Sequence, residues 1–206
     1  CAEMAMKNVM LLTLGLMIAG AVLAVSIGDF ARDFRAEDWR GKQIQLSEIV
    51  KNQNVLLIFS RYIGCSWCQM FIIELHNRRK DIADTNTKVI ILNLSPKDVL
   101  AKYDSPEDFQ FDLVPDPERK IYELYGVKLD ERKITGNVLW QSIRFLKYLG
   151  GYKYVSHGLD GPHYQAPACF IIGRDGKIKA MHLGKDVADN PKVDLIISEL
   201  QKLNRN

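Results

Sequence analysis

The chain has 206 residues and a formal net charge of +3, with 47% hydrophobic and 26% charged residues. This length is sufficient for one sizeable hydrophobic core. The proportions are those of a globular protein rather than of a disordered one. The small net charge gives no reason to expect nucleic-acid binding, and the basic cluster Arg78–Lys80 is typical of a solvated helix face.

An apolar segment precedes the rest of the chain. No charged residue occurs from Val9 to Ile27, and Lys7 stands just before this run. A positive start, an apolar stretch and small residues near its end are typical of a secretory signal peptide. Val22-Leu23-Ala24 and Ala24-Val25-Ser26 are both suitable cleavage contexts. The run is also long enough to cross a bilayer as one helix, so a membrane anchor is an equal alternative.

We therefore expect residues 1–26 to be a signal peptide or membrane anchor and residues 27–206 to form the domain. Either alternative places the domain outside the cytoplasm, secreted, periplasmic or anchored by residues 8–27. Met6, directly before Lys7, would make a conventional start, and a lipid-modified Cys1 is disfavoured because it precedes the apolar run. Compartments beyond the membrane are usually oxidising, so a pair of close cysteines there rests as a disulfide unless a donor reduces it.

Downstream of this segment, strand-like and helix-like patterns alternate, which predicts an α/β layered domain. The expected strands are a hairpin around Trp39–Lys42, then Val55–Phe59, Lys88–Leu94, Leu113–Val114, Ala168–Ile172 and Lys177–His182. The expected helices are Cys68–Ala83, one opened by Ser95 as cap with Pro96 in its first turn, one from Asp116 to Gly126, and Val193–Leu203. Residues 129–164 form a long insertion with a helical apolar stripe in Val138–Leu149.

Two cysteines, Cys65 and Cys68, follow the strand Val55–Phe59 and lie in the first turn of the next helix. The free N–H groups of a helix start stabilise a nearby anion, which lowers the pKa of a thiol there. A separation of three residues brings two sulfurs close enough to form a small disulfide. The spacing therefore predicts a reversible dithiol/disulfide pair, in which Cys65 is the more exposed, nucleophilic thiolate and Cys68 the resolving cysteine. Arg61 is close in sequence and could stabilise the thiolate or polarise a peroxide.

Three motifs resemble the peroxiredoxin-like redoxins of the alkyl hydroperoxide reductase/thiol-specific antioxidant superfamily, which have the thioredoxin fold. They are Arg61–Gln69 (RYIGCSWCQ), Val114–Val127 with its VPDPE start, and Gln165–Ile172 (QAPACFII) followed by DGKI. This resemblance implies a central mixed β-sheet flanked by helices, with the helical insertion and the N-terminal apolar segment as additions. It also implies that Pro167 is cis opposite the cysteines and exposes the backbone of Ala166 for pairing with an extended substrate.

The motif departs from that of true peroxiredoxins, which resembles P-x-x-x-[T/S]-x-x-C. No proline stands at the corresponding position, and no Thr or Ser lies three residues before Cys65. Trp67 lies between the two cysteines, where general thioredoxins have Gly-Pro. Both departures leave the substrate open: the resemblance implies a protein disulfide or a peroxide, with a thioredoxin-like protein as thiol donor.

Other functions compete with this hypothesis. One is a membrane-tethered reductant of exported proteins, which shares the cysteine pair and the apolar segment. Another is a copper-delivery protein of similar fold, although those use C-x-x-x-C plus a distant histidine. The pair could also be a structural disulfide, or half of a zinc site for which only distant histidines and Cys169 are available. Cys169 is expected in the core, and no cofactor or metal is expected.

Overall fold

The computed structural model describes residues 24–102, 110–129 and 164–204. Within them lies a five-stranded sheet in the order β5-β4-β3-β6-β7. The strands are β3 (Asn54–Phe59), β4 (Thr87–Asn93), β5 (Asp112–Pro115), β6 (Ala168–Ile172) and β7 (Ile178–Leu183). Strands β3, β4 and β5 are mutually parallel, whereas β6 is antiparallel to both β3 and β7. The predicted mixed sheet is therefore present.

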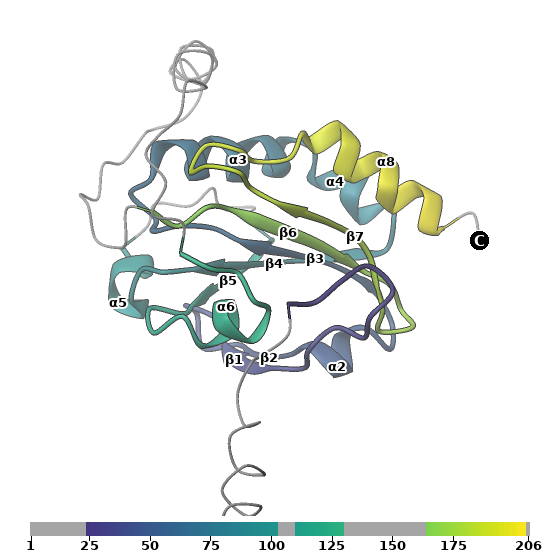
Figure 1. The fold of residues 1–206 in the computed structure, drawn as a ribbon, viewed down its shortest axis with the longest axis horizontal. Coiled ribbons are helices and arrows are strands. Elements are labelled where there is room, and N and C mark those ends of the chain that lie inside the picture. Colours follow the sequence, from purple (N-terminus) through teal and green to yellow (C-terminus); the bar gives the residue numbers. More distant parts are fainter. Residues whose placement is uncertain (1–23, 103–109, 130–163, 205–206) are drawn as a thin grey trace, which may run out of the picture.

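Helices cover both faces of this sheet (Figure 1). On one face lie α3 (Ser66–Asn77), α4 (Arg79–Ala83) and α8 (Val193–Leu203). On the other lie α2 (Leu46–Ile49), α6 (Lys120–Leu124) and the two-stranded hairpin of β1 (Arg35–Glu37) and β2 (Gln43–Gln45). A short helix, α5 (Lys97–Leu100), follows β4. Because strand side chains alternate between faces, the sheet separates two apolar clusters, one on each side.

Two predicted helices differ in detail. The expected helix Cys68–Ala83 begins earlier, at Ser66, and is interrupted at Arg78, whose backbone (φ −103°, ψ 15°) is not helical. The second difference concerns Ser95, which does not cap the following helix. Its hydroxyl accepts a hydrogen bond from the N–H of Ile63 at 2.9 Å, and Pro96 occupies the cap position. Ser95 therefore supports the turn that precedes the cysteines.

The predictions for β1–β2, β3, β4, β6, β7 and α8 are confirmed to within a residue or two. The predicted strand Leu113–Val114 is one residue longer at each end, and α6 is shorter than the predicted helix, although Gly126 ends it with a φ of 69°. Residues 130–163, including the stripe Val138–Leu149, lie outside the described residues. Among the described helices, none combines the length and the apolar character needed to cross a bilayer.

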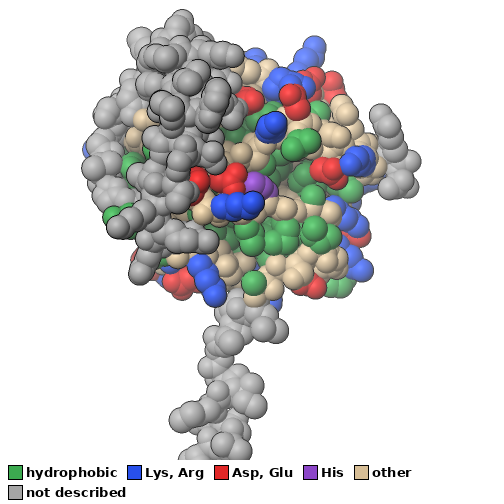
Figure 2. Space-filling view, turned by 45° about the horizontal axis from the view of Figure 1, so that its top comes forward, with side chains coloured by type: hydrophobic (Ala, Val, Ile, Leu, Met, Phe, Trp, Pro, Cys, Tyr) green, Lys and Arg blue, Asp and Glu red, His purple; other side chains and the backbone are tan. Residues whose placement is uncertain are grey.

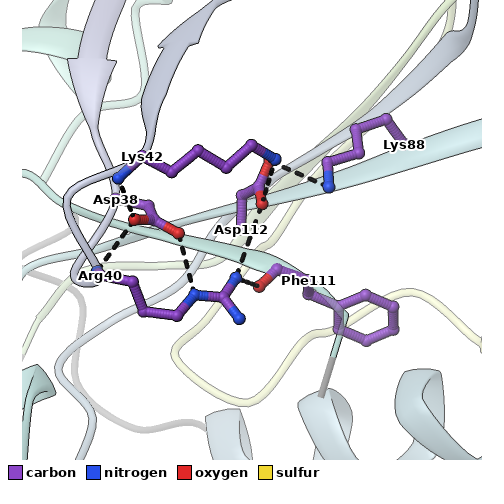
Figure 3. A network of polar contacts seen from close by, with 6 residues as sticks. All are labelled: Asp38, Arg40, Lys42, Lys88, Phe111 and Asp112. Atoms are coloured by element: carbon purple, nitrogen blue, oxygen red, sulfur yellow. Dashed lines mark hydrogen bonds and ion pairs between the residues drawn. The ribbon is translucent and has the colours of Figure 1, made fainter. Parts of the chain in front are cut away.

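A polar network ties the turn between β1 and β2 to strands β4 and β5 (Figure 3). The carboxylate of Asp112 is 1% exposed and lies 2.9 Å from Lys42 Nζ, 3.1 Å from Lys88 Nζ and 3.7 Å from Arg40 Nη2. Asp38, which is fully buried, accepts bonds from the backbone N–H groups of Arg40 and Lys42. On the face shown in Figure 2, basic and acidic side chains are interspersed.

Candidate active site

The site lies at the carboxyl end of β3, where the chain turns into α3. Ser60 N–H donates to the carbonyl of Leu92, and Leu94 N–H donates to the carbonyl of Arg61, so the turn stays paired with the end of β4. The hydroxyl of Tyr122, fully buried, donates to the carbonyls of Ser60 and Leu92. These bonds fix the backbone directly before the two cysteines.

Cys65 is the N-cap of α3, and its sulfur accepts a hydrogen bond from the N–H of Cys68 at 3.3 Å. The two sulfurs therefore face the same first turn, as predicted from their spacing. Cys65, Cys68 and Cys169 are free thiols. The expected greater exposure of Cys65 is wrong: Cys65 is 2% exposed and Cys68 3%. Part of the reason is local, because Tyr62 and Trp67 pack in one cluster with the two cysteines.

Arg61 is only 5% exposed and lies inside the site. Its Nη2 donates to Cys65 Sγ at 2.9 Å. The guanidinium carbon lies 5.4 Å from the centre of the Tyr62 ring and 5.7 Å from that of Trp67. Burial lowers the pKa of Arg61, but the adjacent sulfurs of Cys68 and Cys65 outweigh it and raise the pKa above its ordinary value. The guanidinium is therefore a fixed positive charge beside both thiols.

One of the two thiols loses its proton more readily than the other. Burial opposes ionisation of Cys68, but the Cys65 thiol, the Arg61 guanidinium and N–H, and the Ser60 hydroxyl together lower its pKa to about 6. The pKa of Cys65 is raised well above its ordinary value, by burial and by its bond to the neighbouring sulfur. This order is the reverse of that expected from the sequence. The hydrogen bonds to sulfur do not follow this order: Cys65 Sγ accepts from both Arg61 Nη2 and Cys68 N–H, so the lowered pKa belongs to the coupled pair beside Arg61.

Pro167 lies beside the turn that precedes the cysteines, but not in the predicted conformation. Ala168 pairs with Phe59, which places Pro167 beside the turn at Ser60. The prediction that Pro167 is cis is wrong, because no peptide bond among the described residues is cis. The trans form is the default even before proline. The carbonyl of Pro167 accepts a hydrogen bond from Gly184 N–H at 2.8 Å.

The expected exposed backbone of Ala166 is also absent. Ala166 is 7% exposed, and its carbonyl accepts a hydrogen bond from the side chain of Gln165 at 2.8 Å. Gln165 in turn accepts from Arg119 at 3.0 Å. An extended substrate would have to displace this bond before it could pair with that carbonyl.

Cys169 is confirmed as a core residue, 4% exposed in β6, where burial raises its pKa to about 12. Among the described residues, no three His, Cys, Asp or Glu side chains gather closely enough to hold a metal ion. His157 and His163 lie outside the described residues. The sequence did not place Ser60, Ser95 or Tyr122 at this site. Ser60 and Ser95 stand just after the end of a strand, and this position in the sequence was the feature that could have indicated a place at the site.

A thioredoxin-like sheet with two thiols and a buried arginine at the start of the first long helix defines a thiol-dependent redox enzyme. The model of the AhpC/TSA family matches residues 27–181, and the chain belongs to this family. The resemblance inferred from the three motifs is thus confirmed.

Individual proteins agree with this assignment. The chain is 21% identical over 172 residues to Peroxiredoxin-like 2C of Bos taurus, which covers 78% of this chain and 73% of that protein. The peroxidoxin BcpB of Mycobacterium tuberculosis has a TM-score of 0.63 at 17% identity, over 87% of this chain and 98% of that one. A protein described as a thiol:disulfide interchange protein DsbE of Chlorobium tepidum has a TM-score of 0.54 at 21% identity, over 86% and 99%. At these identities the two structures show a common fold.

Proposed function

We propose that this protein reduces a small hydroperoxide with Cys65 and Cys68 and finishes the reaction as a Cys65–Cys68 disulfide. The observation that carries the proposal is the buried contact of Arg61 with both sulfurs, 2.9 Å from Cys65 Sγ. This arrangement keeps a thiolate charged inside a site that excludes water, and a thiolate is the nucleophilic form of cysteine.

Burial favours a small substrate. Displacement at a protein disulfide requires a second polypeptide to reach the attacking sulfur in line. Cysteine residues that are 2% and 3% exposed offer no such surface. A hydroperoxide needs only room for its two oxygen atoms beside the sulfur. The bonded carbonyl of Ala166 supports the same choice, because the backbone expected to hold an extended peptide is already in use.

The unequal pKa values give each cysteine a role, because neighbouring groups with separated pKa values divide base and acid functions between them. The Cys68 thiolate attacks the terminal oxygen of the hydroperoxide. A sulfur–oxygen bond forms while the oxygen–oxygen bond breaks. The leaving alkoxide takes the proton of the Cys65 thiol and departs as the alcohol. Cys68 is then a sulfenic acid, and Cys65 is a thiolate beside Arg61.

In the second step, Cys65 attacks the sulfur of the Cys68 sulfenic acid. The disulfide forms as hydroxide leaves, and hydroxide takes a proton from solvent to become water. The peroxide has then gained two electrons and the pair has lost two. An external thiol donor, such as a thioredoxin-like protein, returns them by exchange.

The first test follows peroxide consumption by the reduced protein in stopped flow. We expect a rate well above that of free cysteine; an equal rate would remove the peroxidase hypothesis. The second test assigns the roles with a sulfenic-acid trap. Cys65→Ser should form a trapped sulfenic acid at position 68 after one equivalent of peroxide. Cys68→Ser should form none, and a trapped adduct at Cys65 instead would restore the order expected from the sequence.

A second candidate function is reduction of disulfides in exported proteins. It is favoured by the fold similarity to the DsbE protein and by the apolar N-terminal segment. Turbidity of insulin in the presence of a thiol donor distinguishes it. Rapid insulin reduction that depends on both cysteines, together with slow peroxide reduction, would support this candidate instead.

A further inference from the structure

The residues that end the apolar N-terminal run belong to the folded domain. Val25 is 4% exposed and packs into the core cluster on the α6 side of the sheet. Ala24 lies against Gly126, where an added Cβ would be 3.0 Å from the Ala24 Cα. Packing therefore starts before the domain boundary expected at residue 27.

Hydrogen bonds hold the next residues in place. The N–H of Ser26 donates to the carboxylate of Asp29 at 2.8 Å. The N–H of Gly28 donates to the carbonyl of Ile178 at 2.8 Å, and Ile178 N–H donates back to Asp29 at 2.9 Å. The chain from Val25 onward is thus tied to the start of β7.

This attachment separates the two cleavage contexts that the sequence leaves open. Cleavage after Ser26 would remove Val25 from the core and break the Ser26–Asp29 turn. Cleavage after Ala24 would keep Val25 in the core and leave the Ser26–Asp29 turn intact. Ala24 is exposed, so its removal takes little apolar surface out of the domain. We infer that a signal peptidase hydrolyses the Ala24–Val25 peptide bond and recognises Val22 and Ala24. In this hydrolysis, water supplies the hydroxyl group to the Ala24 carbonyl and a hydrogen to the Val25 amine.

The same attachment argues against an uncleaved anchor. With Ala24 and Val25 held by the domain, the charge-free run available to a membrane is Val9–Leu23, 15 residues. As a helix it would span about 22 Å, short of the roughly 30 Å of a bilayer hydrocarbon core. Fifteen residues fall within the usual length of the apolar region of a signal peptide.

The test is expression of the full chain in a secreting bacterium, with the intact mass of the exported protein as readout. We expect a mature chain that begins at Val25. Two single substitutions separate the contexts. Val22→Gln should block processing, because position 22 lies three residues before the inferred bond. Ser26→Gln should leave processing unchanged, because Ser26 lies beyond that bond and is exposed.

Two results would overturn the inference. One is a mature chain that begins at Ile27, with processing blocked by Ser26→Gln. The other is a full-length chain retained in the membrane fraction. A stability measurement on the exported protein checks the physical argument separately. Val25→Ala should lower the Tm by about 5 °C, whereas Ile27→Ala, at a position 62% exposed, should leave it nearly unchanged. Equal shifts would contradict the role of Val25 in the core.

Discussion

Arg61 Nη2 lies 2.9 Å from Cys65 Sγ, although Arg61 precedes the helix and Cys65 caps it. The guanidinium is held between Tyr62 and Trp67, so it cannot swing to solvent without losing two aromatic contacts. A charge fixed in this way stabilises a thiolate in whichever of the two sulfurs carries it.

Removing the charge of Arg61 should therefore slow the reaction with peroxide. We expect Arg61→Met to reduce the second-order rate by about 10- to 100-fold, the loss of a charge-assisted hydrogen bond of about 1.5–3 kcal/mol. The thiolate absorbance should appear at higher pH. Arg61→Lys should recover only part of the rate, because one ammonium does not reproduce the planar guanidinium. Arg174→Met, at an exposed position, is the matched control. An unchanged rate in Arg61→Met would contradict the role of this charge.

The cysteine pair should make the stability of the reduced protein depend on pH. The folded pKa of Cys68, about 6, lies below its unfolded value of about 8.5. Its contribution to stability is therefore present above the unfolded pKa and is lost as the pH falls through 6. The raised pKa of Cys65 acts oppositely: its contribution is present below the unfolded pKa and is lost as the pH rises further.

The pair alone should thus give a free energy of unfolding that rises from about pH 6 to about pH 8.5 and then falls. Urea unfolding across this range checks the profile, and the double variant Cys65→Ser/Cys68→Ser supplies the background to subtract. If the difference in unfolding free energy between the reduced protein and the double variant does not change with pH, neither pKa is shifted by folding.

Asp112 should be a determinant of stability far from the cysteines in sequence. Three cations surround its buried carboxylate, and Lys88 is itself only 22% exposed. Asp112→Asn leaves the Lys88 ammonium without its compensating charge, which should cost about 2–3 kcal/mol of unfolding free energy. Glu48→Gln removes a carboxylate from an exposed ion pair with Lys51 and should cost less than about 0.5 kcal/mol. Similar costs for the two variants in urea unfolding would refute the prediction.

Cys169 should not react while the protein is folded. It is buried in β6, and burial raises its pKa to about 12, so almost no thiolate is present near neutral pH. Iodoacetamide at pH 7.5, followed by peptide mass analysis, should modify Cys65 or Cys68 much faster than Cys169. In urea, all three should react at comparable rates. Fast native modification of Cys169 would indicate that β6 opens readily.

Local patterns along the chain are enough to predict the family motifs and most of the regular elements. Buried strands such as Val55–Phe59 and Ala168–Ile172 can be predicted because every residue in them is apolar. The turn at Asp175–Gly176 can be predicted because its residue types favour that geometry. The cysteine spacing also identified the pair, since proximity three residues apart follows from local geometry alone.

The surroundings of those cysteines, by contrast, follow from how the whole chain folds. The turn that carries Arg61 and both thiols is held by bonds to segments distant in sequence, from the Tyr122 hydroxyl to the carbonyl of Ser60 and from Leu94 N–H to the carbonyl of Arg61. A pKa and an exposed fraction depend on every neighbour in space, whereas a motif specifies only neighbours along the chain. For the same reason, the attachment of Val25 to the core could not be read from an apolar run whose composition suits both a membrane and a protein interior.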